Sequence, residues 1–376
     1  MNKSGSVFKR ILIIATRQIG DVLCTTPLMR RAREFWPDTV IDVLGYEKTM
    51  GMLAGNPDIN EVIESPEHPK WPQYRLLIKK IFRRYDLAIV TQASDRAHIY
   101  GFLAAPRRIG IVPPSNQHAW WKKWACEFSI QMAGADRHVI VDRARLMDGY
   151  ASKLGLSGPT HRSHQPTLVP PKAQTLPSDV ESFLEKPYLV VHATPMWRYK
   201  QWPVLHWVRL IEALTDKGFG VVLTGSAATS DQTLNDLIQS QLLSSKKPQV
   251  IDLCGHLTLG QLTTLLAGAK AYIGVDTSIS HQAAAVGTPV IALFGPTSPV
   301  YFGPWPQSAQ WDPTQDSVWQ KTAQARQRIG NVTIVQGPGN CVPCMRAGCN
   351  DHNDSHSLCL ERLDPQTVLD ALKDVA

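Results

Sequence analysis

A carboxylate and two hydroxyl groups stand directly after an apolar run in the segment Asp276-Thr277-Ser278. The run before them, residues 271–275, predicts a buried strand, and a short helix of small residues is expected to follow until Gly287 ends it. In an open α/β sheet, the N-terminus of such a helix offers free N–H groups to an anion at the carboxyl edge. The segment therefore indicates a phosphate site, although the same residues would also make an ordinary helix N-cap.

Two further strand-like runs lead into side chains that suit a phosphate. Thr194 and Lys200 follow the run 188–193, and Ser226 follows the run 220–225. An ammonium group and hydroxyls near a helix N-terminus match the charge and hydrogen-bonding needs of a diphosphate. A lone lysine before Trp-Pro is more often a surface residue, but three such strand ends in one half of the chain favour a nucleoside diphosphate ligand.

The N-terminal segment ILIIATRQIGDVLCTTPLMRRA, residues 11–32, predicts a buried strand, a sharp turn at Gly20 and a helix. Dinucleotide-binding proteins carry the glycines of a G-x-G-x-x-G turn at this point, where the backbone approaches a pyrophosphate. Here Gly20 is the only one of those glycines, and Asp21 follows it. A dehydrogenase is therefore disfavoured, and a helix N-cap is the structural explanation for Asp21.

Four cysteines near the C-terminus follow the spacing C-x2-C-x4-C-x9-C. Thiolates at such a spacing can form a tetrahedral site for a structural zinc or iron ion, with two nearby histidines as additional ligands. Reduced structural cysteines, or disulfides formed on oxidation, would explain the same pattern. The residues concerned are Cys341, Cys344, Cys349 and Cys359, with His352 and His356 inside the segment.

Basic residues of the first half gather in the segments RLLIKKIFRRYD, QASDRA, APRRIG and AWWKKW. Arg96 and Arg108, in two of these segments, are candidates for binding a phosphorylated or acidic acceptor. The tryptophans within residues 120–124 would suit sugar rings or a membrane interface. The cations of the first segment would equally form one solvated helix face.

The elements that must position these groups alternate between strand-like and helical patterns, which indicates α/β architecture with parallel sheets. A proline-rich stretch, residues 158–179, separates two groups of strands and indicates two domains in tandem. Asp364 as an N-cap and Pro365 at the first helical position predict a terminal helix. The expected strands lie within residues 11–15, 40–45, 86–90, 108–112, 188–193, 220–225, 250–254, 271–275 and 289–295.

Length and composition are those of an ordinary globular protein. The 376 residues are 43% hydrophobic and 19% charged, which allows two well-formed cores. The formal charge of +7 favours an anionic partner, and no nucleic-acid-binding motif is found. No apolar run approaches the ~18–20 residues that span a bilayer, and the run 11–15 is too short for a signal peptide, so we expect a cytoplasmic protein.

Taken together, these segments resemble the bacterial heptosyltransferase family, which builds the lipopolysaccharide core. The matching segments are, in family order, RQIGDVLCTTPLMRRAREFWP, HATPMWRYKQWP, LTGSAATSD, CGHLTLGQLTTLLAGAKAYIGVDTSISHQAAAVGTPVIALFGPT and CVPCMRAGCN. The resemblance implies a GT-B fold, in which two Rossmann-like domains face each other across a cleft and the C-terminal helix crosses back to the first domain. It also implies an inverting sugar transfer, typically from ADP-heptose, that requires no cofactor for catalysis.

The resemblance also assigns roles to individual residues. Asp21 falls where family members carry the general base, Gly20 belongs to the same acceptor turn, and Lys200 would stabilise the leaving diphosphate. Leu257 falls where an apolar residue meets the adenine, and His281 would face the phosphate or only brace the loop. The expected donor-binding residues are Thr194, Lys200, Ser226, Leu257, Asp276, Thr277, Ser278 and His281.

We therefore expect an acceptor domain over residues 1–160, a linker over 161–179, a donor domain over 180–360 that includes the cysteine-rich segment 341–359, and a C-terminal helix over 361–376. The predicted reaction is heptose transfer from ADP-heptose to a lipopolysaccharide core acceptor, by an enzyme in peripheral contact with the inner membrane. A transferase of this fold with another nucleotide sugar or a protein acceptor is the main alternative. A nucleotide-sugar epimerase and a non-catalytic scaffold are less favoured.

Overall fold

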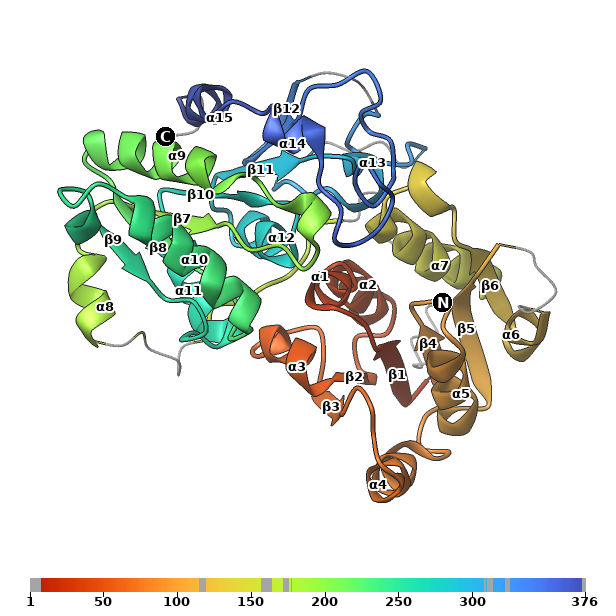
Figure 1. Ribbon diagram of the computed structural model, residues 1–376. Coiled ribbons are helices and arrows are strands. Elements are labelled where there is room, and N and C mark those ends of the chain that lie inside the picture. The colour runs from red at the N-terminus through yellow and green to blue at the C-terminus, as the bar shows by residue number, and fades with distance from the viewer. Residues whose placement is uncertain are drawn as a thin grey trace. The chain divides into compact units, whose positions relative to one another are not determined.

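The computed structural model describes residues 8–114, 120–156, 164–171, 176, 178–307, 309, 314–321 and 325–373. The chain divides into two compact units, residues 1–167 and 168–376, and each unit is built on one sheet (Figure 1). The division lies within the proline-rich stretch, much of which falls outside the described residues. The α/β class predicted from the alternating pattern is confirmed.

The sheet of the first unit has six parallel strands in the order β3-β2-β1-β4-β5-β6. β1 lies at the centre, where Ile13 pairs with both Val43 of β2 and Ile89 of β4. A strand with neighbours on both sides and helices on both faces is buried throughout, which explains its continuous apolar sequence. The strands are β1 (Arg10–Ala15), β2 (Val40–Tyr46), β3 (Glu61–Ser65), β4 (Leu87–Val90), β5 (Arg107–Val112) and β6 (Phe128–Gln131).

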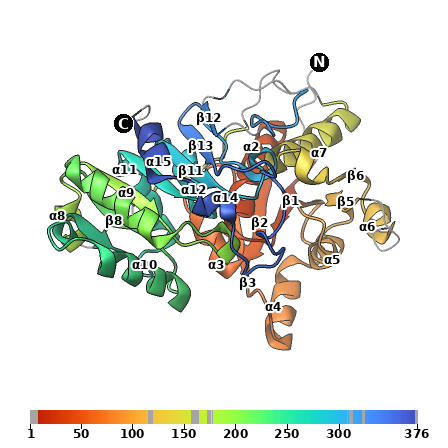
Figure 2. The same ribbon diagram turned by 45° about the horizontal axis from the view of Figure 1, so that its top comes forward.

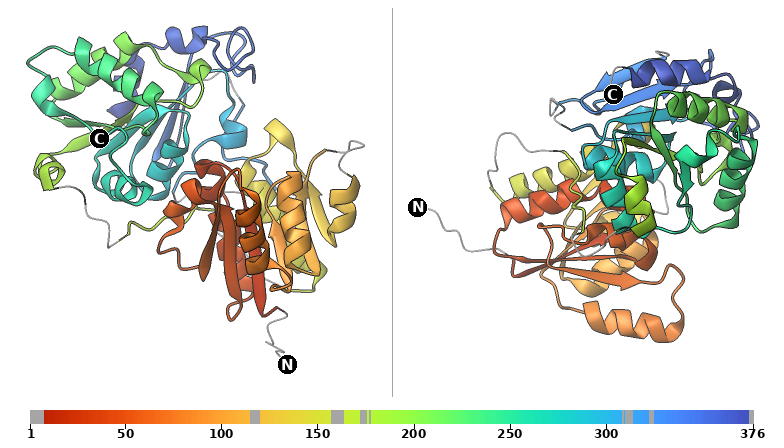
Figure 3. Two further views of the ribbon diagram at one scale, coloured as in Figure 1. Left: turned by 60° about the horizontal axis from the view of Figure 1, so that its bottom comes forward. Right: turned by 90° about the vertical axis from the view of Figure 1, so that its left-hand side faces the viewer.

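Helices cover both faces of this sheet (Figure 3). On one face, Leu12 and Ile14 of β1 form an apolar cluster with Leu77 of α4 and Tyr100 of α5. α2 and α7 pack against each other. The helices are α1 (Ile19–Leu23), α2 (Thr26–Phe35), α3 (Glu47–Met50), η1 (Gly51–Leu53), α4 (Trp71–Ile81), α5 (Asp95–Ala104), α6 (Trp120–Ala125), η2 (Gly134–Asp136) and α7 (Val139–Lys153).

The turn after β1 differs from the prediction. Gly20 does not form a sharp turn, because it is the second residue of α1, whose N-cap is Gln18. The prediction of one helix is also wrong, since α1 ends at Leu23 and α2 begins three residues later with Pro27 in its first turn. Proline lacks the N–H that would continue the hydrogen bonds of α1.

The sheet of the second unit has seven strands in the order β12-β13-β11-β10-β7-β8-β9. All neighbouring pairs are parallel except β12 and β13, which are antiparallel at one edge. The strands are β7 (Tyr188–His192), β8 (Gly220–Leu223), β9 (Val250–Asp252), β10 (Ala271–Val275), β11 (Val290–Phe294), β12 (Arg326–Ile329) and β13 (Val332–Gln336). The helices are α8 (Ser178–Phe183), η3 (Arg198–Lys200), α9 (Val204–Asp216), α10 (Thr229–Gln241), η4 (Lys247–Gln249), α11 (Leu259–Gly268), α12 (Ser278–Ala285), α13 (Pro299–Phe302), α14 (Leu358–Glu361) and α15 (Pro365–Leu372).

Each of the nine strands predicted from apolar runs is present, and four strands, β3, β6, β12 and β13, were not predicted. β12 carries arginine at alternate positions and β3 carries Glu61 and Glu64, and both strands lie at sheet edges, where one side needs no apolar burial. None of the described helices has the length and apolarity that crossing a membrane requires.

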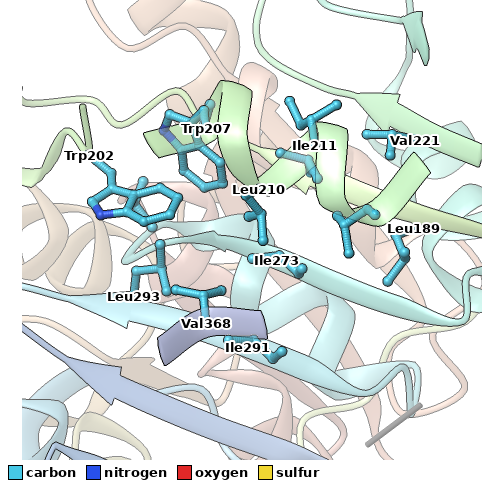
Figure 4. Packing of buried hydrophobic residues seen from close by; sticks show 14 of the residues in the cluster. Leu189, Trp202, Trp207, Leu210, Ile211, Val221, Ile273, Ile291, Leu293 and Val368 are labelled. Carbon is cyan, nitrogen blue, oxygen red and sulfur yellow. The ribbon is translucent and has the colours of Figure 1, made fainter. Parts of the chain in front are cut away.

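Two tryptophans organise the core of the second unit. The rings of Trp202 and Trp207 meet edge to face with centroids 4.7 Å apart (Figure 4). The indole N–H of Trp202 donates to the carbonyl oxygen of Leu363 at 3.0 Å, so its polar atom is satisfied inside the core. This bond ties the loop before α15 to the loop before α9.

The terminal helix begins as predicted, since the Asp364 carboxylate accepts a hydrogen bond from the N–H of Gln366 at 2.7 Å. Val368 and Leu372 join the core of the second unit, and α15 lies beside α9 (Figures 1 and 2). The prediction that the C-terminal helix crosses back to the first domain is therefore wrong for its described part. Its apolar face is already buried on its own unit.

Replacing Leu372 by alanine tests this assignment of α15. The side chain is 3% exposed, so its truncation leaves a cavity that should lower the free energy of unfolding by about 2–5 kcal/mol. Urea unfolding followed by tryptophan fluorescence should show the lower midpoint. The matched variant Leu237→Ala, on the exposed side of α10, should change the free energy by less than about 0.5 kcal/mol. An equally small change in both variants would contradict the packing of α15.

Candidate functional site

β7, β10 and β11 are neighbouring parallel strands of the second unit, so the residues that follow them emerge at one edge of the sheet. Lys200, in η3 after β7, donates from Nζ to Oδ2 of Asp276, the first residue after β10, at 2.6 Å. Thr297, which follows β11, donates its hydroxyl to the same oxygen at 2.9 Å. The three strands thus assemble a carboxylate, an ammonium group and a hydroxyl. The sequence analysis did not name Thr297 as a site residue, although this threonine follows the predicted strand 289–295 and ends one of the segments that resemble the family.

The Lys200–Asp276 pair is largely withdrawn from water. Burial lowers the pKa of Lys200, but the attraction of Asp276 more than offsets this effect, so that the pKa of the lysine is raised. The ammonium group therefore stays charged at neutral pH. The lysine side chain keeps 21% of its surface exposed, against 6% for Asp276, so the cation is the more accessible partner.

α12 begins directly beside this pair. Thr277 occupies its N-cap position, but the Thr277 hydroxyl makes no capping hydrogen bond, contrary to the prediction. The N–H groups of the first turn, which begins at Ser278, therefore receive no hydrogen bond from the side chain of the N-cap residue. The positive end of the helix dipole and the Lys200 ammonium group together make this edge suitable for a diphosphate.

A buried histidine connects the ends of β7 and β8. Nδ1 of His192 lies 3.0 Å from the hydroxyl of Thr224, and Nε2 lies 3.5 Å from the hydroxyl of Thr194. Burial lowers the pKa of His192 to about 4, although the charge of Asp231 acts in the opposite direction. The ring is therefore neutral at pH 7 and positions Thr194 without adding charge to the edge.

The turn after β8 is closed by Asp231, whose Oδ2 accepts from the N–H of Ser226 at 2.9 Å and from its hydroxyl at 2.7 Å. The turn needs glycine at position 225, since a Cβ there would lie 2.5 Å from Sγ of Cys254 and 3.2 Å from Oγ1 of Thr194. Ser226 therefore donates its hydroxyl proton to Asp231, and only its oxygen lone pairs and its position at the edge are left for a ligand.

Two predicted donor residues pack into the unit. His281 on α12 is 1% exposed, and its ring lies 4.7 Å from the ring of Phe302, centroid to centroid. Of the two roles expected for His281, this packing favours bracing the loop. Leu257, half-buried between β9 and α11, packs against an apolar cluster of the same unit.

In the first unit, Asp21 is the third residue of α1 and not its N-cap, which removes the structural alternative considered for it. Nη2 of Arg143, on α7, donates to Oδ1 of Asp21 at 3.0 Å. Arg143 is 3% exposed and Asp21 19% exposed, so a buried cation orients a carboxylate that still reaches solvent. The sequence analysis missed Arg143, because 122 residues separate the two partners and no local pattern marks the arginine.

Arg96 shares an edge of the sheet with Asp21. It is the second residue of α5, after the carboxyl end of β4, and its guanidinium donates to the hydroxyl of Tyr46 at the end of β2, at 3.2 Å. This is the edge at which α1 follows β1, so Arg96 remains a candidate for the acceptor.

Arg108 lies elsewhere. It pairs within the sheet with Ala88, which also pairs with Leu12, close to the start of β1 and away from the carboxyl edge. Its guanidinium donates to the carbonyl oxygens of Ala105 at 2.8 Å and Ala125 at 2.6 Å. This placement argues against the prediction that Arg108 binds the acceptor.

A family model described as glycosyltransferase family 9 (heptosyltransferase) matches residues 74–328, which include parts of both units. The chain belongs to this family. Its activity class is therefore that of a glycosyltransferase, as predicted.

Relatives of this glycosyltransferase cover most of its length. Lipopolysaccharide heptosyltransferase 3 of Escherichia coli is 28% identical over 298 residues, which are 76% of this chain and 83% of the relative. The structure of E. coli ADP-heptose lps heptosyltransferase II superposes with a TM-score of 0.69 at 22% identity, over 97% of this chain and 98% of that chain. The iron-containing dodecameric glycosyltransferase TibC of enterotoxigenic E. coli gives 0.53 at 14% identity, over 98% of this chain and 76% of TibC. The predicted GT-B fold is confirmed.

The four clustered cysteines of this glycosyltransferase line one pocket of about 790 Å³. Cys341 and Cys349 are exposed, Cys344 is half-buried and Cys359 is buried, and all four are free thiols. Among the described residues, which include these cysteines, no three His, Cys, Asp or Glu side chains are placed to hold a metal ion. A structural zinc or iron ion at these cysteines stays a prediction.

Acid should destabilise this glycosyltransferase through His192. Its pKa of about 4 in the folded chain lies below the value of ~6.5 for an exposed histidine, so between these values the unfolded chain binds a proton that the folded chain does not. The contribution of His192 to the free energy of unfolding should be fully present above pH ~6.5 and should decrease towards pH ~4. At pH ~5 the free energy of unfolding should be lower by about 2 kcal/mol. Between pH ~7 and pH ~5, the urea midpoint of the wild type should therefore fall by more than the urea midpoint of His192→Gln. Parallel losses in the two proteins would contradict this role of His192.

Proposed function

We propose that this family 9 glycosyltransferase transfers heptose from ADP-heptose to a lipopolysaccharide core acceptor, with inversion at the anomeric carbon. The observation that carries the proposal is the Lys200 ammonium group at the start of α12, beside the carboxyl edge of the sheet. Such an edge suits a nucleoside diphosphate. The names of the relatives, heptosyltransferases of lipopolysaccharide, support the choice of sugar and acceptor.

In this proposal the second unit binds the donor. Lys200 and the first-turn N–H groups of α12 contact the diphosphate, and Thr194 contributes a hydroxyl. As the bond between the anomeric carbon and the diphosphate oxygen breaks, negative charge grows on that oxygen, and the fixed ammonium group and helix dipole stabilise it. Asp276 keeps Lys200 in place and charged. Leu257 would contact the adenine.

Asp21 acts as the general base for the acceptor, with Gly20 beside it in α1 and Arg96 as an acceptor contact. The acceptor hydroxyl oxygen attacks the anomeric carbon, and its proton passes to the carboxylate. Arg143 engages Oδ1, which leaves Oδ2 as the oxygen that would take the proton. Arg143 is thus a positioning residue.

The proposed chemistry needs no metal ion, because Lys200 and α12 supply the positive charge that the leaving group requires. We further propose that the enzyme works in the cytoplasm, in peripheral contact with the inner membrane. Mass spectrometry of reactions with a panel of nucleotide sugars and truncated lipopolysaccharides, run in the presence of a chelator, tests the donor, the acceptor and the metal independence together. Transfer only from a different nucleotide sugar, or only to a protein, would replace the proposed substrates.

The variant Asp21→Asn should reduce kcat by about 10²–10⁴-fold, because the base acts in the transition state. The affinity for ADP, measured by calorimetry, should stay within a few-fold of the wild type. Arg143→Gln should also lower kcat at unchanged ADP affinity, and Arg143→Lys should restore part of the rate. Turnover of Asp21→Asn close to that of the wild type would rule out Asp21 as the base.

The variant Lys200→Ala should weaken ADP binding by roughly 10- to 100-fold, since a charge-assisted contact contributes about 1.5–3 kcal/mol. Because this variant leaves Asp276 without its cation, the double variant Lys200→Ala/Asp276→Asn is the matched control. If the lysine contacts the diphosphate, the double variant should still bind ADP weakly. Recovery of wild-type affinity in the double variant would show that the loss comes only from the unpaired carboxylate.

A further inference from the structure

Large apolar side chains are exposed on one part of the first unit. Among its described residues, every large hydrophobic side chain that is exposed belongs to α4, α5 or α6, or directly follows α4. Monomeric proteins rarely gather exposed apolar groups in this way without a partner. The residues, with their exposed fractions, are Trp71 (73%), Leu76 (64%), Phe82 (53%), Ile99 (48%), Phe102 (46%), Trp120 (69%) and Trp124 (78%).

The same surface is strongly cationic along α4. Residues 70–84 contain six lysines and arginines and no aspartate or glutamate. All six cations are exposed, and none is paired with an acidic side chain among the described residues. They are Lys70, Arg75, Lys79, Lys80, Arg83 and Arg84.

The helix presents these groups outward because its opposite face is fixed in the core. Leu77 and Ile81 are buried in the apolar cluster under the sheet. Trp71, Arg75 and Lys79 are spaced four residues apart, so they form one row on the outer face. Apolar and cationic side chains are therefore mixed on the exposed face, and lysine or arginine stems can lie along the apolar groups while their charges reach outward.

α5 joins α4 to a second apolar area. The N–H of Arg83 donates to the carbonyl oxygen of Leu103 at 3.0 Å, and α5 contacts both α4 and α6 (Figure 1). Between α5 and α6 lies a hollow of about 370 Å³, lined by aliphatic and aromatic side chains that include the three tryptophans of α6. The guanidinium of Arg108 lies 5.0 Å from the ring centre of Phe102 and adds a cation at its border. The residue that did not suit the acceptor site is thus part of this surface.

We propose that α4, α5 and α6 form a docking surface for an anionic lipid bilayer. Tryptophan, phenylalanine and leucine enter the headgroup region of a bilayer, and lysine and arginine bind its acidic phospholipids. A nucleic acid would use the cations but not the exposed aliphatic groups. An acidic protein partner would be recognised through the cations alone, and the apolar hollow between α5 and α6 would then have no role. The mixture of apolar and cationic groups therefore points to lipid.

The biological role of this docking surface rests on the proposed function, because docking would hold the acceptor-binding unit at the surface where a lipid-linked acceptor lies. Lipid binding itself requires no transfer reaction. The two proposals can therefore fail separately.

Sedimentation of the full-length protein with vesicles of phosphatidylethanolamine and phosphatidylglycerol tests the surface. The protein should bind these vesicles at low salt, bind less at high salt, and not bind vesicles of phosphatidylcholine alone. Lys79→Gln/Lys80→Gln should weaken partitioning by about thirtyfold, since each cation contributes about 1 kcal/mol near an acidic membrane. Leu76→Ser/Phe82→Ser should weaken it as well, without lowering Tm.

The matched control is Leu237→Ser/Leu243→Ser, which removes two leucines of the second unit that are 45% and 57% exposed. It should bind vesicles like the wild type. Transfer to a water-soluble truncated acceptor should be unchanged in the α4 variants. If the wild type itself does not transfer sugar to this acceptor, that result contradicts the proposed function and leaves the docking surface untouched. Equal binding by the α4 variants and the wild type would overturn the inference. Retention on heparin or RNA without vesicle binding would overturn it too.

Discussion

A parallel strand delivers the residues that follow it to the carboxyl edge of its sheet, and both units position their reactive groups through this constraint. In the second unit, three adjacent strands bring Lys200, Asp276 and Thr297 within hydrogen-bonding distance, although they are 76 and 21 residues apart. In the first unit, the strand at the centre of the sheet delivers Asp21 to the same kind of edge, where Arg143 meets it. One architecture thus places a carboxylate at such an edge in one unit and an ammonium group in the other, as the proposed base and leaving-group contact require.

The sequence predicts well the features that depend on local pattern. The central strands are continuous apolar runs because they are buried on both faces, and the cap at Asp364 depends on residues next to it. Edge strands such as β12, with the sequence RQRI, carry no such signal. Arg143 could not be predicted, because its significance arises only when α7 packs beside α2 and brings the guanidinium to a carboxylate far away in sequence. The prediction of which unit the terminal helix packs on was wrong for the same reason. The apolar stripe of this helix indicates that one face is buried, but it does not indicate on which unit.

Charge is distributed differently from what the net value suggests. The formal charge of +7 favours an anionic ligand, yet the buried cations of the two edges are neutralised by Asp276 and Asp21. The six cations of residues 70–84, which have no acidic partner in the described part of the chain, lie instead on the exposed surface of α4 and directly beside this helix. Bulk charge therefore describes the outer surface of this enzyme, whereas the proposed diphosphate site depends on one lysine held at the start of a helix.

The distribution of thiols has a practical consequence for spectroscopy. Burial raises the pKa of Cys24 and Cys254 to about 12 and that of Cys126 and Cys359 to about 11, so these sulfurs are poor nucleophiles at neutral pH. Cys341 and Cys349, in contrast, are exposed. A maleimide fluorophore or spin label should therefore attach to the cysteine-rich segment without replacement of Cys24, Cys126 or Cys254. Such a label would report on the second unit alone. With Cys344 and Cys349 replaced by serine, a single cysteine introduced on the first unit would form a pair with Cys341 for measuring the distance between the two units.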